Sequence, residues 1–291
     1  MNQPAVLRSQ AEALSAALPP LLAEAEHLAM TVLMGEHGRR RAGQGDEFWQ
    51  YRPATPGDEA RSIDWRRSGR SDGHFVREKE WQAAQSVLLW IDDAASMAFR
   101  GGDDRPTKGE RARLLAMATS VLLSRGGERV GLAGLGLPPR RGAVQLLRLA
   151  EALSAPFSSA DYGTAEARAM LPNSRALYIS DFLGDLAPLE QALGKAADRG
   201  IKGAILQVLD PDEEAFPYGG RTIFESMQGG LRHETLKAGD LRDRYLERLA
   251  ERKGQLSDLA RMSGWHFSTH HTADSAQAAL LWIFRALERV H

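Results

Sequence analysis

The sequence contains no cysteine among its 291 residues. Disulfide bonds, thiolate catalysis and cysteine-ligated metal centres are therefore excluded. A chain without cysteine fits a reducing compartment. The first ten residues, MNQPAVLRSQ, also lack the basic stretch and apolar core of a secretory signal peptide. We therefore expect a cytoplasmic protein.

Long apolar runs and an excess of charge of one sign are also missing. The longest apolar run, Ala278 to Phe284, is far shorter than the roughly 20 residues that a membrane-spanning helix needs. The 37 basic and 38 acidic residues give a formal net charge of -1, so nothing attracts nucleic acid or anionic lipid in bulk. We expect neither a nucleic-acid partner nor an integral membrane segment.

Nucleotide-binding fingerprints are absent as well. No G-x-x-x-x-G-K-[ST] loop occurs, so the chain is not itself a P-loop ATPase. Gly131, Gly134 and Gly136 spell G-x-x-G-x-G, which is not the dinucleotide-binding pattern. We interpret them as closely packed strand and turn residues.

What the sequence does contain is a central stretch, SVLLWIDDAASM, from Ser86 to Met97. Its apolar residues run together and stop at Asp92 and Asp93, which is typical of a buried parallel strand reaching the edge of its sheet. The run ALYI from Ala176 repeats the pattern and leads into Ser180 and Asp181. Ligands of open α/β sheets bind outside the carboxyl ends of the strands. We therefore expect Asp92 and Asp181 to face one crevice.

The remainder of the chain after Ser86 alternates between predicted strands and helices. Strands are expected at 129–135, 204–209 and 265–269, and helices at 109–124, 145–153, 165–171, 186–199, 240–262 and 275–290. This alternation predicts an α/β domain with a doubly wound, mostly parallel sheet over residues 86–291.

Residues 1–85 lack this regular alternation and are predicted to form helices followed by a small β subdomain. Residues 10–34 suggest two helical pieces, interrupted at Pro19-Pro20. Further on, the alternation in residues 62–66 and the hairpin signal Asp72-Gly73 indicate short strands. The last strand, beginning at Phe75, is expected to continue into the central strand without a linker.

The sequence Asp92-Asp93-Ala94-Ala95-Ser96 resembles the D-x-S-x-S element of von Willebrand factor A domains. The resemblance implies a Mg²⁺ site whose ligands would be Asp92, Ser96, Thr164 and Asp181. Ala94 replaces the first serine, so Mg²⁺ binding should be weak or absent. The alternative is that Asp92 and Asp181 cap helices and line a polar crevice without a metal.

The preceding segment, GQGDEFWQYRPATPGDEARSIDWRRSGR, closely resembles the signature of the domain of unknown function 58 family. Members of that family pair a small β region with a von Willebrand factor A-like domain. The resemblance implies an adaptor or partner of a MoxR-type AAA+ ATPase, acting in protein-complex assembly or maturation. The matching positions are Gly43, Gly45, Glu47, Phe48, Arg52, Gly57, Asp58, Arg61, Ile63, Trp65 and Arg70.

Two roles are open for the arginines of this segment. Arg52, Arg61 and Arg70 could form a partner-binding surface, or they could pair with nearby carboxylates and be structural. Trp65 is expected to be an anchor of the small core, and Gly57 to serve a turn.

The leading functional hypothesis is therefore a non-enzymatic protein-interaction module with a degenerate metal-ion-dependent adhesion site. The alternative is a Mg²⁺-dependent, Rossmann-like phosphohydrolase with Asp92 as nucleophile and Asp181 as metal ligand. Such enzymes carry a second acid two residues after the nucleophile, where this chain has Ala94. His266, His270 and His271 are interpreted as a solvated rim, because no third ligand is evident nearby.

Overall fold

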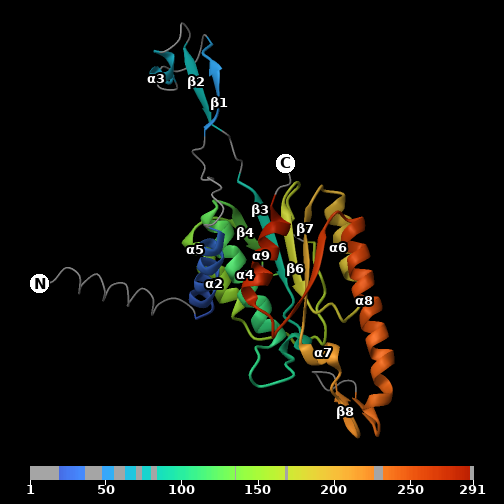
Figure 1. Ribbon diagram of the computed structural model, residues 1–291. Helices are drawn as coiled ribbons and strands as arrows, with labels where there is room; N and C mark the ends of the chain where they lie inside the picture. Colours follow the sequence, from blue (N-terminus) through green and yellow to red (C-terminus); the bar gives the residue numbers. More distant parts are fainter. Residues whose placement is uncertain are drawn as a thin grey trace, which may run out of the picture. The chain divides into compact units, whose positions relative to one another are not determined.

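The computed structural model divides the chain into two compact units, one formed by residues 36–84 and one by residues 1–35 together with 85–291 (Figure 1). The larger is the α/β unit, and the smaller is the β unit. The structure describes residues 20–36, 48–55, 63–69, 74–79, 84–134, 136–167, 170–225 and 232–288.

The α/β unit is built on a six-stranded sheet with the order β10-β7-β6-β3-β4-β5. Neighbouring strands are parallel except at one edge, where β5 runs antiparallel to β4. This doubly wound arrangement confirms the predicted fold class, and it places β3 and β6 side by side at the centre. The strands are β3 (Ser86–Ile91), β4 (Arg129–Leu132), β5 (Leu137–Arg140), β6 (Arg175–Ser180), β7 (Lys202–Leu209) and β10 (His266–His271).

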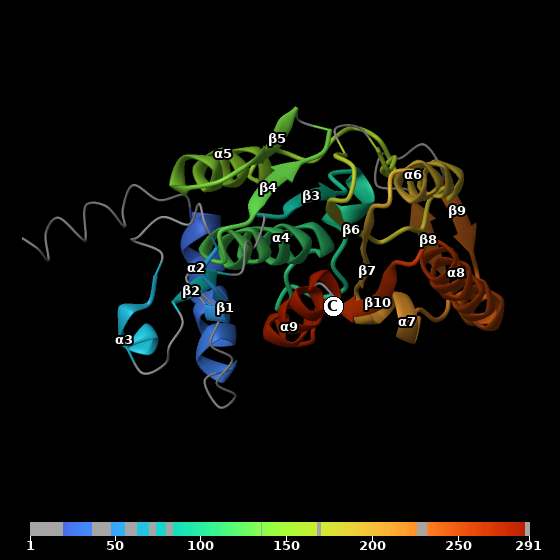
Figure 2. The same cartoon turned by 90° about the horizontal axis from the view of Figure 1, so that it is seen from above.

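Helices cover both faces of the sheet (Figure 2). Successive residues of a strand point to opposite faces, so Leu89 joins the core beneath one helical layer while Leu88 and Trp90 join the other. The first layer contains α2 (Pro20–Glu36), α4 (Lys108–Arg125), α5 (Ala143–Leu153) and α9 (Ala276–Leu287). The second contains α6 (Ala187–Ala197) and α8 (Arg242–Met262). None of the described helices is both long and apolar enough to cross a membrane.

Helix α2 corrects the expected grouping of residues 1–85. Leu22, Ala25, Ala29 and Val32 repeat at helical spacing and are buried in the core that includes the helices α4 and α9. The apolar stripe of α2 therefore belongs to the α/β unit rather than to the β unit. The other predicted helical piece, which precedes Pro19, lies outside the described residues.

Short elements follow the carboxyl ends of the strands. They are the 3₁₀ helix η2 (Ala95–Ala98), α7 (Pro211–Ala215), the antiparallel pair β8 (Thr222–Glu225) and β9 (Arg232–Thr235), and the 3₁₀ helix η3 (Ala238–Leu241).

In the β unit, β1 (Phe48–Pro53) pairs antiparallel with β2 (Phe75–Lys79), and α3 (Trp65–Ser68) lies between them in sequence. The strand expected at residues 62–66 is wrong, because the Ser68 amide and hydroxyl both donate to the Asp64 carbonyl and close a helical turn. Trp65 is 58% exposed, so it is not the buried anchor that its alternation suggested.

Three further predictions need correction. The helix expected at 165–171 is not formed by its described residues, and the Glu166 carbonyl instead accepts a hydrogen bond from the Tyr178 hydroxyl. The helix expected at 240–262 is α8, which begins only at Arg242, because Ala238–Leu241 form η3. β2 ends at Lys79 and β3 begins at Ser86, so the two are separate strands, and residues 80–83 lie outside the described part.

The interpretation of the glycines in residues 131–136 is confirmed. A side chain on Gly131 would lie 2.6 Å from the Pro139 nitrogen of the paired strand β5. Gly134 and Gly136 have φ angles of +82° and +64°, which glycine adopts without strain.

Candidate functional site

The candidate site lies where β3 and β6 end. The Asp92 side chain is only 2% exposed, and both of its carboxylate oxygens accept hydrogen bonds from the protein. Oδ1 accepts from the Ala94 amide at 2.8 Å, and Oδ2 accepts from the Ser180 hydroxyl at 2.6 Å. Gly163 packs so closely that a Cβ there would lie 2.2 Å from Asp92 Oδ1. The protein therefore encloses this carboxylate.

Asp181 is enclosed in the same way, and it is 1% exposed. Its Oδ1 accepts from the Leu183 amide at 3.1 Å, and its Oδ2 accepts from the Lys108 ammonium at 2.8 Å. Its carbonyl oxygen accepts from the side-chain amide of Gln207 at 2.9 Å. Asp92 and Asp181 thus lie in one crevice, as predicted, but the positive charge beside Asp181 comes from a lysine.

Lys108 is the central charged residue of the site. Its side chain is 1% exposed, and its Nζ also lies 2.7 Å from Glu213 Oε1. Lys108 is the first residue of α4, directly after the Thr107 cap, where the helix dipole disfavours a positive charge. Two carboxylates offset both that dipole and the burial of the ammonium. The side chain is therefore an internal cation held between the ends of β6 and α7.

The electrostatics of the cluster follow from its charges. Burial opposes the charged ammonium, but the Asp181 and Glu213 carboxylates outweigh it, so the pKa of Lys108 is raised. Burial also raises the pKa of Glu213. The Lys108 ammonium, which Glu213 shares with Asp181, opposes this rise only in part. Burial likewise raises the pKa of Asp92, against the hydrogen bonds from Ser180 and Ala94.

The other two predicted metal ligands differ in their surroundings. Ser96 is buried, and its hydroxyl has no hydrogen-bond partner within the described part of the chain. Thr164 is exposed and lines a groove of about 250 Å³ together with Asp92, Asp93 and Arg113. The structure thus brings Thr164 to a groove that Asp92 lines and Asp181 does not.

This donor set does not fit a divalent cation as it stands. All four carboxylate oxygens of Asp92 and Asp181 already accept hydrogen bonds, and the positive charge of the Lys108 ammonium, 2.8 Å from Asp181 Oδ2, disfavours a second cation beside it. Among the described residues, no three His, Cys, Asp or Glu side chains are grouped to hold a metal ion. The cavity that touches both aspartates measures about 10 Å³, which is room for about one water molecule.

The sequence did not point to Lys108, although a weak signal was present. A lysine in the first turn of a capped helix, T-K-G-E, contradicts the dipole rule and indicates that acids from elsewhere hold it. Glu213 forms a capping box with Asp210, so its side chain is positioned by the first turn of α7. Asp181 and Glu213 are both far from Lys108 in the sequence, so the cluster becomes visible only in the fold.

The predicted arginine surface is only partly within the described structure. Arg52 lies on β1, where its backbone is paired with Val76 of β2. Arg61 and Arg70 lie outside the described residues, as do Gly57 and Asp58.

The histidines near the end of β10 form no metal site in the described structure. His270 is buried rather than solvated, its ring lies 3.1 Å from the Arg111 guanidinium, and burial lowers its pKa to about 4. His271 instead contacts Glu214 and Asp274.

These features define an α/β protein with paired aspartates at the ends of two adjacent central strands. The family described as "Protein of unknown function DUF58" matches residues 50–255. This match spans most of the chain, and the chain belongs to the DUF58 family, as its resemblance to the signature implied.

Relatives and solved structures extend this comparison. Uncharacterized proteins of Mycobacterium tuberculosis and Mycobacterium bovis are each 27% identical over 280 residues, which is 91% of this chain and 87% of theirs. An aerotolerance-related membrane protein from Bacteroides fragilis is similar in structure, with 19% identity, a TM-score of 0.44 and coverage of 70% of this chain and 98% of that one. The SpRpn10 VWA domain has 11% identity, a TM-score of 0.37 and coverage of 72% and 100%.

Proposed function

We propose that this chain is a non-enzymatic protein-interaction module that works with a MoxR-type AAA+ ATPase without a divalent cation in the Asp92 crevice. The family resemblance supports the partner, and the cysteine-free sequence supports a cytoplasmic setting. The observation that carries the metal-independent part is the Lys108 ammonium, which lies 2.8 Å from Asp181 and 2.7 Å from Glu213. In this proposal the crevice is a degenerate adhesion site in which lysine supplies the positive charge.

The geometry gives less support to the alternative phosphohydrolase. A nucleophilic Asp92 would need an accessible carboxylate oxygen. The residue is 2% exposed and both of its oxygens accept hydrogen bonds from the protein, so neither oxygen is free to attack a phosphate group in the groove of about 250 Å³ that Asp92 also lines. A phosphatase assay with a generic aryl phosphate and Mg²⁺ separates the two functions. Turnover that disappears in Asp92→Asn would establish the enzyme and refute the proposal.

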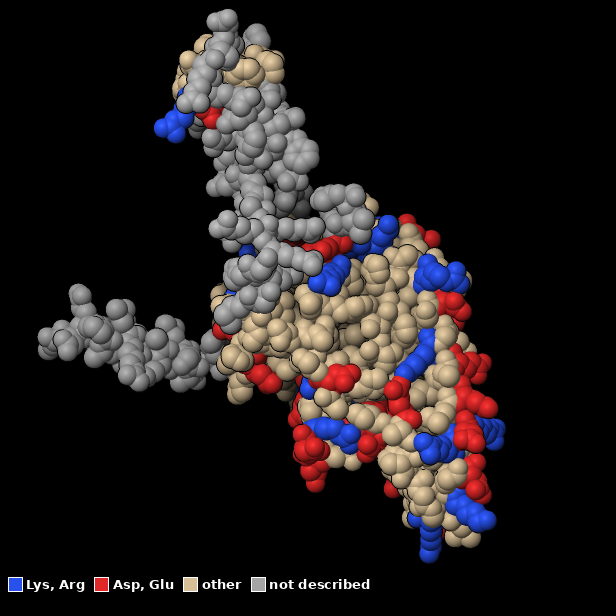
Figure 3. All heavy atoms as spheres, in the orientation of Figure 1, with Lys and Arg blue, Asp and Glu red and all other residues tan. Residues whose placement is uncertain are grey.

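The surface charge agrees with a protein partner. Acidic and basic side chains are intermixed over the face of the α/β unit drawn in Figure 3, and that face carries no broad patch of one sign. Nucleic acid would require such a basic patch.

The test of the proposal is capture of a purified, nucleotide-free MoxR-type ATPase from the same genome by the immobilised chain. We expect equal capture in Mg²⁺ and in EDTA, and weaker capture by Asp181→Asn, because that change removes one of the two carboxylates that hold the Lys108 ammonium and loosens the crevice. Asp258→Asn is the matched control, since Asp258 is exposed on α8 and pairs only locally with Arg261. Absence of a complex with the wild-type chain would overturn the proposed partner.

A further inference from the structure

A further cavity, larger than the crevice, adjoins the Lys108 cluster through Glu213. Its volume is about 520 Å³, within the range of ligand-binding pockets. It is lined by residues of the connection between η2 and α4, of α7, of the β8–β9 pair and of α8. Glu213 lines the pocket and also forms the ion pair with Lys108. We call it the aromatic pocket, after the rings of Phe99, Phe216, Tyr218, Phe224 and Tyr245.

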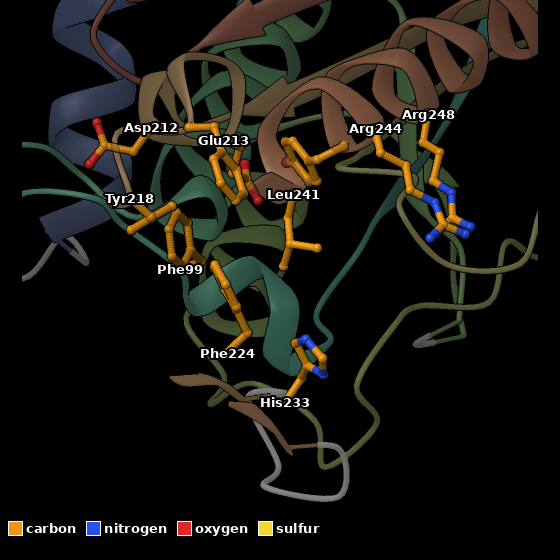
Figure 4. Close-up of a pocket in the computed structure, with 11 residues that line it drawn as sticks. Phe99, Asp212, Glu213, Tyr218, Phe224, His233, Leu241, Arg244 and Arg248 are labelled. Carbon is orange, nitrogen blue, oxygen red and sulfur yellow. The ribbon is translucent and has the colours of Figure 1, made fainter. Parts of the chain in front are cut away.

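The aromatic rings form a connected set around Phe216. The Phe216 ring stacks on Phe224 at 5.8 Å and lies 5.1 Å from the Tyr245 ring. Figure 4 shows Phe99, Phe224 and Leu241 directed towards the centre of the pocket. Such a lining favours a bulky apolar group, because aromatic contacts add to the free energy of burial.

Phe216 also has an unusual backbone. Its φ angle is +44°, in the left-handed region that bulky residues rarely adopt. The residue ends α7, and this conformation turns the chain so that its ring joins the pocket. Strain of this kind persists where the surrounding structure enforces it, and it is concentrated at binding sites.

The charges around the aromatic pocket are not balanced. On its acidic wall, Glu213 is paired with Lys108 and Asp212 with Arg105. On the opposite side, Arg244 and Arg248 are exposed and form no ion pair or hydrogen bond within the described part of the chain. They are four residues apart on α8, where like charges repel, and their side chains extend together to one side of the pocket (Figure 4).

We propose that the aromatic pocket binds an acidic peptide segment of the ATPase partner, with one aromatic or large aliphatic side chain inserted among the rings. Carboxylates next to that anchor pair with Arg244 and Arg248. The inference rests on the proposed function, because it takes the ATPase as the partner. It assigns the contact to an apolar anchor and two charged pairs rather than to a metal-held carboxylate.

Fluorescently labelled synthetic peptides test the chemistry. The probe carries a central phenylalanine with two aspartates on each side, and the full chain is titrated into it. We expect binding that weakens at least tenfold in the Arg244→Glu, Arg248→Glu double variant. We also expect at least a fivefold loss when asparagine replaces the aspartates or serine replaces the phenylalanine.

The matched control is Arg242→Glu, because Arg242 is exposed on the same helix but does not line the pocket. It should bind the probe as the wild type does, and thermal unfolding should show that all variants are folded. Equal binding of the acidic and asparagine peptides, equal loss in Arg242→Glu, or no binding to the wild type would overturn the inference. Tighter binding of a free aromatic acid than of the peptide would also overturn it.

Capture of the ATPase separates this inference from the proposed function. Loss of capture in the double variant, together with competition by the probe, would support both. Full capture by the double variant would overturn the pocket assignment and leave the ATPase partnership standing. If the wild-type chain captures no ATPase, the partnership fails and the assignment of the pocket to an ATPase segment fails with it, even where the peptide binds.

Discussion

The crevice at Asp92 and Asp181 and the aromatic pocket are connected through Lys108, which pairs with Asp181 of the crevice and Glu213 of the pocket. The two sites differ in how their polar groups are satisfied. In the crevice, every carboxylate oxygen accepts a hydrogen bond from the protein itself. At the pocket, two arginines have no partner in the described structure and the rings surround open space. A group of acids that resembles a metal-site motif can therefore be satisfied within the protein, and we propose the neighbouring pocket as the binding site.

The largest effect is expected from Lys108→Met. Removing one partner of a buried ion pair leaves an uncompensated charge and typically costs about 3–5 kcal/mol, so we expect this loss in the free energy of unfolding. Chemical denaturation measures it. Lys195→Met is the control, because Lys195 is exposed on α6 and should change stability by less than about 0.5 kcal/mol. Similar stabilities for the two variants would mean that the cluster is not a structural element.

A smaller loss is expected when the crevice is overpacked. A Cβ on Gly163 would meet Asp92 Oδ1 at 2.2 Å, so Gly163→Ala should destabilise the chain by about 1–3 kcal/mol. Gly194→Ala provides the contrast, because nothing lies within 4 Å of that Cβ and alanine favours the interior of a helix. Opposite signs for the two changes in thermal unfolding are expected. An unchanged stability in Gly163→Ala would show that the crevice is loosely packed.

The pH dependence of stability tests the burial of Asp92. Its folded pKa is raised, so the stability that it contributes is complete below about pH 4 and is lost as the pH rises through the folded pKa. Asp92→Asn removes this loss, and its stability relative to wild type should rise between pH 4 and pH 8. The gain equals the free energy that ionising the buried Asp92 carboxyl costs the folded chain. A difference that is flat with pH would contradict the raised pKa.

The smallest change in stability is expected at the pocket. Arg248→Gln removes an exposed charge without a described partner, so it should alter the free energy of unfolding by less than about 0.5 kcal/mol. Thermal unfolding alongside Lys108→Met makes the contrast direct. A loss above 1 kcal/mol would show that Arg248 supports the fold rather than a ligand.

The central strands of the sheet could be predicted from the sequence, because each strand is marked by its own short apolar run. The apolar run ending at Asp92 and its counterpart ending at Asp181 predicted two strands that lead into one crevice. The structure shows that these strands are neighbours, with Leu88 paired with Ala176 and Ile91 with Ile179. Short or edge elements were harder. The alternation around Trp65 was too brief to separate a strand from a helical turn, and β5 carries two prolines that are tolerated at a sheet edge.

The candidate site was predicted only in part. Asp92 and Asp181 share the crevice as expected, because parallel strands bring their carboxyl ends to one edge. The identity of the cation was missed, because Lys108 and Glu213 are 105 residues apart and meet only through the fold. The aromatic pocket was missed for the same reason, since Phe99, Phe216 and Tyr245 come from separate elements and show no shared pattern in the sequence.

A titration of Mn²⁺ into the wild-type chain tests most directly whether the Asp92 crevice works without a divalent cation. The electron paramagnetic resonance signal of the free ion monitors the titration. If the Lys108 ammonium supplies the positive charge of the crevice, the signal should grow as it does in buffer alone. Uptake of one Mn²⁺ per chain that disappears in Asp181→Asn, but not in the Asp258→Asn control, would contradict the account and restore the metal site.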